Sequence, residues 1–274
     1  MTGTLIRFHL RRHRLLFVLL PILVVAHEWL FLYIYQFWRE QTQFAGWILR
    51  WVPDAVREGV GIPLTDLTDS LTFKALIYLR PDFRVLTLLF GIVVGTDVIA
   101  GEVGRGTSDL LFSHPVRRST AVRAGAAAIA LHLGLIACAM IFGFVTGTRI
   151  FPMGDNQPTL ASILPCVLLV ITWAMVFSLV TMMIGSLAPN RPRAIGITLI
   201  LLIGPMMLGF VGFFSKPIDW LAHLFPEYYY KPHLLLIGGG GLYGAANWIA
   251  LAAIGLVAFA GALFFAERRD LVGS

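Results

Sequence analysis

Long runs of apolar residues without a single charge are the feature that most constrains this chain. Such runs cover residues 124–148, 156–190, 194–215 and 232–266. An α-helix rises about 1.5 Å per residue, so about 20 residues cross the ~30 Å hydrocarbon core of a bilayer. The chain is also 58% hydrophobic and only 13% charged, whereas soluble domains contain roughly 45–50% and 25%. These values exclude the soluble, disordered and disulfide-scaffold classes and indicate a membrane protein.

Two further apolar stretches complete the expected set of spans. The first contains Glu28 and follows an arginine-rich start, as a signal peptide would, but its apolar run continues to Tyr35 and is too long for a signal core. The second contains Asp97 near its end. We therefore expect an all-α integral membrane protein with six transmembrane helices in a single transmembrane domain, 1–274. The expected spans are about 15–37, 85–101, 123–147, 161–187, 194–214 and 245–266.

The placement of arginine predicts the orientation. If both termini are cytoplasmic, the inner segments carry twelve cations: Arg7, Arg11, Arg12, Arg14, Arg105, Arg117, Arg118, Arg123, Arg191, Arg193, Arg268 and Arg269. The two short outer loops then carry only Arg149, Lys216 and Lys231. Short cytoplasmic loops are enriched in lysine and arginine. We expect a multi-pass protein of the inner (cytoplasmic) membrane with both termini inside.

Three connecting segments have a recognisable character. Residues 1–14 mix apolar side chains with four arginines and two histidines, which suits a short interfacial helix against membrane lipid, although simple orienting charge fits equally well. The long outer loop, about 38–84, contains helical apolar spacing around Trp47 and Trp51, which predicts an interfacial helix or an aromatic patch for substrate. Residues 216–244 are apolar but contain three prolines and four consecutive glycines, so we expect an interrupted outer segment before the last helix.

The inner loop between the second and third spans carries the strongest local pattern. Gly106 and Thr107 interrupt the helix that leaves the membrane, and Thr107 or Ser108 can cap a new short helix. That short helix presents apolar side chains and ends at a proline: Leu110, Leu111, Phe112 and Pro115. A stiff cytoplasmic helix with exposed apolar residues is typical of a docking element for another protein.

This loop resembles the signature of ABC-2 type transporter permeases. The resemblance lies in Glu102, the Gly106-Thr107 pair, the Leu110-Leu111 pair, Pro115 and Arg118, in that order. The expected six helices, inner termini, N-terminal surface helix and interrupted outer segment also fit that family, whose fold is that of type V exporters.

The resemblance implies a half-transporter. The 102–118 loop would form a coupling helix that docks on a cytoplasmic ABC ATPase, and the loop around Asn190 and Arg191 would make a second, smaller contact. Two ATPase subunits and a second permease copy or paralogue would complete the transporter. The chain contains no Gly-x4-Gly-Lys-Ser/Thr motif, so ATP and Mg²⁺ are expected on the partner ATPase and no cofactor in this chain. Glu102 is expected to contact the ATPase or to brace the coupling helix, and ion pairing at a helix end is an equal alternative.

Polar residues inside the expected spans are the remaining candidates. Glu28 is a possible substrate-path residue, or it is protonated or paired across the dimer, because ionisable groups in a bilayer are costly. Asn247 is a second possible path residue or an interhelical hydrogen-bond partner. Asp97 is expected to be structural. Cys138 and Cys166 lie in apolar runs and give no metal-ligand spacing, and no nucleic-acid partner or metal site is expected.

Three functions remain open on these grounds. The first is an ABC-2 permease subunit, acting as an exporter and not itself an enzyme. The second is a membrane-embedded enzyme acting on lipid, for which Glu28, His27 and the acids of the outer loop are candidates, although no catalytic triad or HExxH motif occurs in the sequence. The third is a passive channel or scaffold subunit. The 102–118 loop favours the first, because neither alternative needs an apolar docking helix there.

Overall fold

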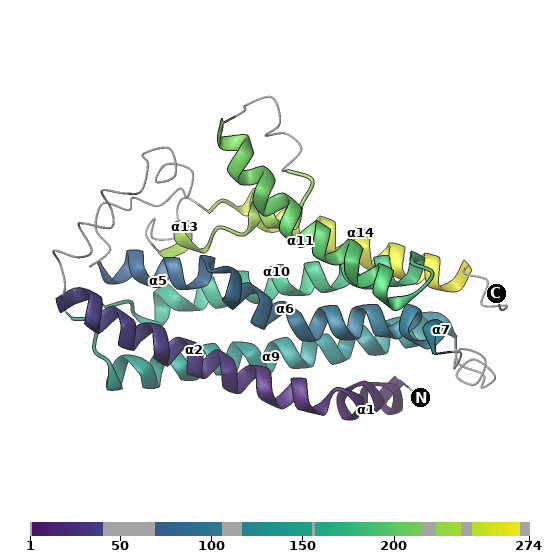
Figure 1. The fold of residues 1–274 in the computed structure, drawn as a ribbon, viewed down its shortest axis with the longest axis horizontal. Helices are drawn as coiled ribbons and strands as arrows, with labels where there is room; N and C mark the ends of the chain where they lie inside the picture. The colour runs from purple at the N-terminus through teal and green to yellow at the C-terminus, as the bar shows by residue number, and fades with distance from the viewer. Residues whose placement is uncertain are drawn as a thin grey trace.

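The computed structural model describes residues 2–40, 69–105, 117–154, 157–214, 223–236 and 243–268, and these ranges are mostly helical, without a strand. The long helices lie side by side along the long axis of the molecule (Figure 1). Five of them are long and apolar enough to cross a membrane, judged over the described ranges. They are α2 (Arg14–Glu40), α6 (Pro81–Thr96) with its continuation to Gly104, α9 (Arg118–Ile150), α10 (Leu160–Leu187) and α14 (Ala245–Arg268). The chain is thus an all-α membrane protein.

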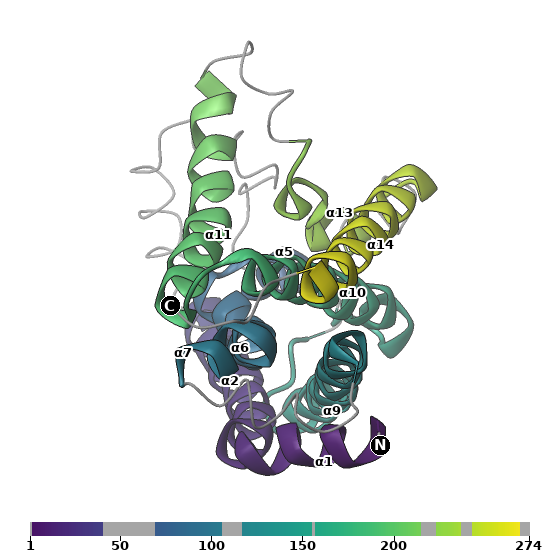
Figure 2. The same ribbon diagram turned by 90° about the vertical axis from the view of Figure 1, so that its right-hand side faces the viewer.

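The start of the chain and the end of the last helix lie at the same end of this bundle. The short helix α1 (Thr2–Arg12) lies across that end beneath α9, and α7 (Glu102–Gly104) is beside it (Figures 1 and 2). We call this end of the bundle, where the chain starts and α14 ends, the α7 end. At the opposite end lies α5 (Ser70–Leu79), and we call it the α5 end.

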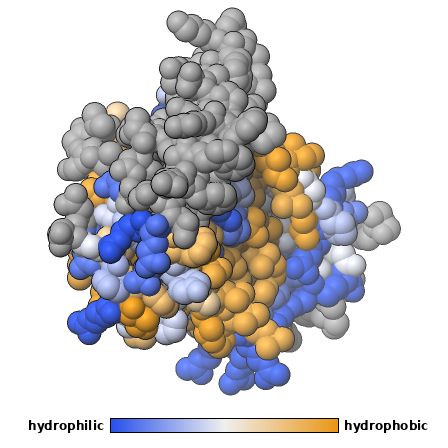
Figure 3. Space-filling model, turned by 60° about the vertical axis from the view of Figure 1, so that its left-hand side comes forward, coloured by the Kyte–Doolittle hydropathy of each residue, from blue (hydrophilic) through white to orange (hydrophobic). Residues whose placement is uncertain are grey.

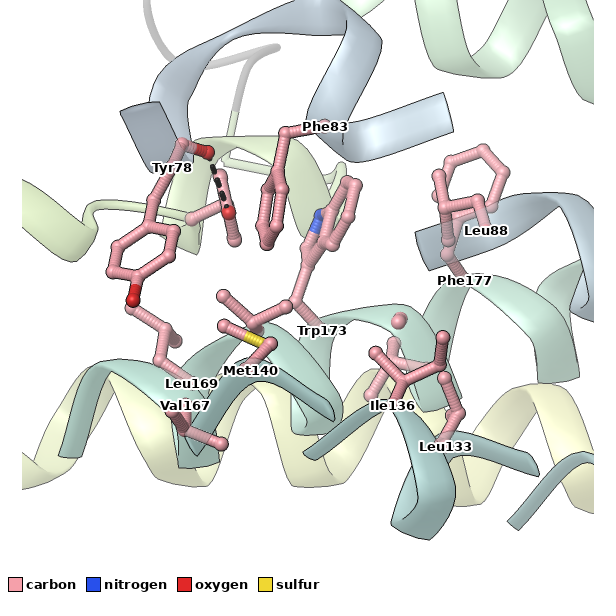
Figure 4. Packing of buried hydrophobic residues seen from close by; sticks show 14 of the residues in the cluster. Tyr78, Phe83, Leu88, Leu133, Ile136, Met140, Val167, Leu169, Trp173 and Phe177 are labelled. Atoms are coloured by element: carbon pink, nitrogen blue, oxygen red, sulfur yellow. Dashed lines mark hydrogen bonds between the residues drawn. The ribbon is translucent and has the colours of Figure 1, made fainter. Parts of the chain in front are cut away.

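Helix α10 occupies the centre of the bundle, where it packs against α6, α9 and α14. Its Trp173 and Phe177 are buried, at 0% and 2% exposed. Trp173 points from α10 toward Phe83 of α6 (Figure 4). Ile136 and Met140 of α9, both 0% exposed, line the same interior. Burial of these large side chains against one helix forms the main core of the described helices.

Glycines allow the helices to approach closely. A Cβ placed on Gly185 of α10 would lie 2.8 Å from the carbonyl oxygen of Gly95 in α6. A Cβ on Gly147 of α9 would lie 2.5 Å from Leu32 of α2. Small residues are favoured where membrane helices pack backbone to backbone, so these positions fix the spacing of α6 against α10 and of α9 against α2.

The outside of the bundle is strongly apolar. Leu15 of α2, Phe142 of α9 and Val257 of α14 are 78%, 56% and 71% exposed. Figure 3 shows the apolar side chains gathered in a broad patch with hydrophilic side chains at its edges. An apolar exterior of this extent is compatible with a lipid environment and with few others.

The second long helix departs from the range expected from hydropathy, 85–101. It begins at Pro81, because proline suits the first helical position, where no N–H is needed. It then passes through a π-helical turn, η1 (Asp97–Gly101), before α7. Arg84, expected in the outer loop, therefore lies within the helix and is 9% exposed.

The remaining elements frame the two ends. Helix α11 (Arg191–Phe214) begins next to α10, with the Oδ1 of Asn190 accepting from the backbone N–H of Arg193 at 3.0 Å. It then slants away from the bundle (Figures 1 and 2). The 3₁₀ turn η3 (Pro226–Tyr229) and helix α13 (Pro232–Leu236) precede α14. The expected outer helix around Trp47 and Trp51, and the four-glycine run at 238–241, lie outside the described residues.

Candidate functional site

The structure describes two of the eight residues expected to couple to an ATPase. Glu102 begins α7, and Arg118 is the first residue of α9. Gly106, Thr107, Leu110, Leu111, Phe112 and Pro115 lie outside the described residues. The site is therefore built from the two helix ends from which that loop leaves and returns.

Asp97, the first residue of the π-helical turn, collects cations from three segments. Its carboxylate is 0% exposed. Nη1 of Arg105 lies 2.7 Å from Oδ1, and Nε of Arg12 lies 3.4 Å from Oδ2. Nε2 of His13 is 3.3 Å from Oδ2, and Nη1 of Arg191 is 3.6 Å from Oδ1. A buried carboxylate is stabilised only when cations and donors surround it in this way.

Glu102 shares two of these cations. Nη1 of Arg12 donates to Oε1 of Glu102 at 2.7 Å, and Nη2 of Arg105 donates to the same oxygen at 2.5 Å. The glutamate is 7% exposed and thus forms ion pairs within the bundle. We define the Asp97 cluster as Arg12, His13, Asp97, Glu102, Arg105 and Arg191.

The Asp97 cluster brings together segments that are distant in sequence. Arg12 comes from α1, Arg105 from the turn after α7, and Arg191 from the first turn of α11. Asn190, the other residue expected in a second contact, caps the same turn of α11. The bases of both expected contacts and the N-terminal helix therefore meet at one carboxylate.

His9 lies on the inner side of α1, close to this cluster, and is 5% exposed. Burial lowers the pKa of its imidazole from 6.5 to about 4, even though the nearby carboxylate of Asp97 favours the charged form. Its neutral form is therefore the one that the fold accommodates.

Glu28 lies toward the other end of the bundle and is fully buried. Its Oε2 accepts from Nζ of Lys74 in α5, and both side chains are 0% exposed. The Lys74 ammonium also lies over the rings of Tyr78 and Phe144, at 4.9 and 5.2 Å from their centroids. The partner of Glu28 is thus a lysine of the same chain, which the sequence alone did not indicate.

The neighbours and counterparts of Glu28 have other surroundings. His27 turns away from Glu28, and its Nε2 lies 3.3 Å from Oδ2 of Asp82. Asn247 lies in the first turn of α14, half-buried, at the α5 end of that helix. Glu28 and Asn247 do not form a common site in the described structure, because no contact between them is present.

A second buried ion pair links α6 to the interrupted segment. Nη1 of Arg84 donates to Oε1 of Glu227 in η3, and the guanidinium lies 4.8 Å from the ring centroid of Tyr230. The Tyr230 hydroxyl donates to the carbonyl oxygen of Tyr78 at 2.7 Å, the dashed bond of Figure 4. Burial raises the pKa of Tyr230, so its hydroxyl stays protonated as a donor.

Two functional cations, Lys74 and Arg84, were not identified from the sequence, although the sequence contains an indication of each. Lys74 stands alone in an otherwise apolar stretch, Phe73 to Leu79, and a single cation in such a setting requires a buried acid. Arg84 is likewise followed by the apolar run of the second span. What the sequence could not supply is which acid each cation meets, since Glu28 and Glu227 are 46 and 143 residues away.

The described residues contain no group of three His, Cys, Asp or Glu side chains able to hold a metal ion. Cys138 is exposed on α9 and Cys166 is buried in α10, and both are free thiols. The charged clusters in the described parts of the chain are therefore networks of acids and cations.

The family of the chain is identified by comparison of its sequence with known protein families. A family model described as ABC-2 family transporter protein matches residues 11–223. This range includes every member of the Asp97 cluster. No curated protein matches the sequence significantly. The chain belongs to the ABC-2 family of transporter proteins and is a multi-pass membrane permease subunit of an ABC transporter, a class that partners ABC ATPase subunits.

Proposed function

We propose that this chain is the membrane-spanning half of an ATP-driven exporter. Two copies, or one copy and a paralogue, form the substrate path, and two ATPase chains bind ATP and Mg²⁺ and supply the energy. The chain itself does no chemistry, and the loop 102–118 transmits the ATPase movement to the helices. The absence of a phosphate-loop motif from the sequence supports the placement of ATP hydrolysis on a partner.

One observation carries this proposal. The helix ends that bound the 102–118 loop and the turn that bears Asn190 and Arg191 lie at the same end of the bundle, where Arg191 contacts Asp97. A single ATPase docked at the α7 end can therefore reach both segments. The ion pair of Arg191 with Asp97 also ties the two segments to each other, which supports a joint role in coupling.

The α7 end faces the cytoplasm in this proposal. On α1, Arg7 and Arg11 are exposed and one helical turn apart, and Phe8 between them is 43% exposed. Exposed cations beside an exposed aromatic residue suit the headgroup region of an anionic inner leaflet. Both termini are then cytoplasmic, and the subunit resides in the inner membrane.

Helix α11 is the sixth span. It has 24 residues, which correspond to about 36 Å of helix and suffice to cross the ~30 Å hydrocarbon core. A crossing by α11 is also required to return the chain from the α7 end to η3 and α13, which form the interrupted outer segment. The whole of 1–274 then makes one transmembrane domain.

Within this domain, Glu28 stabilises the outer half of the subunit through Lys74. Its carboxylate is fully buried against that lysine, so it reaches the substrate path only when the pair opens. Asn247, half-buried at the outer start of α14, lies nearer to the exit that an exporter requires.

Co-purification tests the proposal. Tagged chain is extracted from its native membrane in mild detergent, and the bound proteins are identified by mass spectrometry. We expect an ABC ATPase at a one-to-one ratio with the chain, and its loss by more than tenfold in Leu111→Asp. The matched control is Glu267→Lys, a charge change at an exposed site where α14 ends, at the α7 end of the bundle. This variant should keep the ATPase bound. Recovery of the chain without an ATPase, with lipid turnover by the isolated protein, contradicts the proposal.

A further inference from the structure

The π-helical turn η1 gives Asp97 and Glu102 their common direction. In an α-helix, residues five apart point about 140° from each other, because each residue turns the helix by 100°. A π-helical turn bonds residue i to residue i+5 and brings such residues onto one side. Arg105 can therefore bind both carboxylates, at 2.7 Å and 2.5 Å.

Tight packing holds this turn in place. A Cβ on Gly101 would collide with the carboxylate of Asp97 and lie 3.2 Å from Nη1 of Arg105. A Cβ on Gly125 of α9 would lie 2.5 Å from Cγ2 of Val98, inside the turn. The turn thus fits between its own cations and the facing helix, with room only for glycine at both points.

The partners of Asp97 come from segments that share few other contacts. Helix α1 packs mainly on α9, yet its Arg12 reaches both acids of the cluster. In the described parts of the chain, the first turn of α11 reaches the acids of the cluster through the ion pair of Arg191 with Asp97. Each segment therefore has an arginine whose contact can be removed by itself.

We propose that Asp97 is a positioning residue that joins α1, α7 and the first turn of α11 into one unit. When one of the ATPase-facing segments moves, the other segment and α1 move with it. The inference deepens the proposed function and rests on it, because an ATPase is what drives the movement. Asp97 itself touches neither nucleotide nor substrate.

Spin-label distances test this junction. Labels are attached at Gly3→Cys, Gly104→Cys and Gly196→Cys, one in each segment, because an added side chain at these positions meets nothing within 4 Å. The background carries Cys138→Ser and Cys166→Ala, and labelled chain is diluted with unlabelled chain so that only distances within one copy are measured. In lipid nanodiscs without ATPase, we expect narrow distance distributions for the pairs 3–104 and 104–196.

Three substitutions separate the junction from general damage to the fold. Asp97→Asn broadens both distributions at least twofold. Arg12→Gln broadens only the pair 3–104, and Arg191→Gln broadens only the pair 104–196. The matched control is Asp82→Asn, on the same span at the α5 end, which leaves both distributions unchanged. A variant that merely folds less well is not expected to broaden one distance distribution and leave the other unchanged.

The same labels decide the outcome in the transporter complex. With ATPase bound and trapped in its ATP state, the three labels of the wild type keep their mutual distances, whereas in Asp97→Asn the label at 104 moves relative to the other two. Distances that stay the same in Asp97→Asn, or that change independently in the wild type, overturn the junction. Failure of any ATPase to bind overturns the proposed function, while the distances without ATPase still decide the role of Asp97.

Discussion

Arg105 lies eight residues after Asp97 on the same helical segment, and its Nη1 is 2.7 Å from Oδ1 of that carboxylate. The acid is fully buried, whereas the side chain of the arginine is 33% exposed. A charge pair that extends from the protein interior to the surface is suited to a place where a membrane helix meets a cytoplasmic partner. The stability of this region should therefore depend on the close contact between the backbone at Gly101 and the Asp97 carboxylate.

Gly101→Ala tests that approach. The added methyl group collides with the Asp97 carboxylate, and overpacking of this kind costs about 1–3 kcal/mol. Gly104→Ala, three residues further on, meets nothing within 4 Å and should gain about 0.5–1 kcal/mol from its higher helix propensity. Unfolding in mixed SDS micelles measures both. Equal effects of the two substitutions would show that the turn is not tightly packed around the carboxylate.

The buried pair of Glu28 and Lys74 predicts strong non-additivity. Removal of one partner leaves an unpaired charge in the membrane interior and should lower the free energy of unfolding by about 3–5 kcal/mol. The double variant Glu28→Gln with Lys74→Met leaves no such charge and should recover most of this loss. A double-mutant cycle by SDS unfolding gives the coupling energy. Additive single effects would mean that the two side chains do not interact.

His9 predicts a dependence of stability on pH. Its pKa is lowered from 6.5 to about 4 by burial, so between these values the unfolded state binds more protons than the folded state. Stability should therefore fall as the pH is lowered from 6.5 toward 4, by about 1.4 kcal/mol for each pH unit crossed. Above pH 6.5, His9 contributes no slope. The difference between wild type and His9→Gln isolates this contribution, and parallel curves for the two proteins would count against it.

The pair of Arg84 and Glu227 predicts the order of the outer segment. Glu227→Gln weakens the bond that holds η3 to α6, so the amides of Tyr228 to Tyr230 should exchange hydrogen about tenfold faster or more, equivalent to about 1.4 kcal/mol of local opening. Hydrogen exchange with mass spectrometry measures the rates. Glu40→Gln, at the exposed end of α2, is the control and should leave them unchanged. Unaltered exchange in Glu227→Gln would place the anchor of η3 elsewhere.

The class of this protein could be predicted from sequence because hydropathy and length are local properties. Runs of uncharged residues indicate helices in a bilayer whatever their neighbours are, and the long elements of the described chain are all helices. The start of the second span was harder to predict. Arg84 was assigned to the loop because no acid that could pair with it in a membrane helix is evident nearby in the sequence. The cost of burying it is offset by Glu227, which is 143 residues away in the chain.

The candidate site was only partly predictable for the same reason. Glu102 was identified from its loop, and Asn190 and Arg191 from theirs, but no local pattern indicated that Arg191 contacts Asp97. The sequence also did not indicate the π-helical turn, because that turn depends on the packing of Val98 against α9 and of Gly101 against Asp97 and Arg105. The sequence therefore indicated which residues matter at the α7 end, and the packing of distant helices determined how they meet.

The turnover of the partner ATPase tests the central proposal most directly. The ATPase is purified alone and its ATP hydrolysis is measured in proteoliposomes with the wild-type chain, with Leu111→Asp and without any chain. We predict a change in turnover of at least threefold with the wild type, and the rate of the ATPase alone with Leu111→Asp. A single rate under all three conditions would contradict coupling between this subunit and ATP hydrolysis.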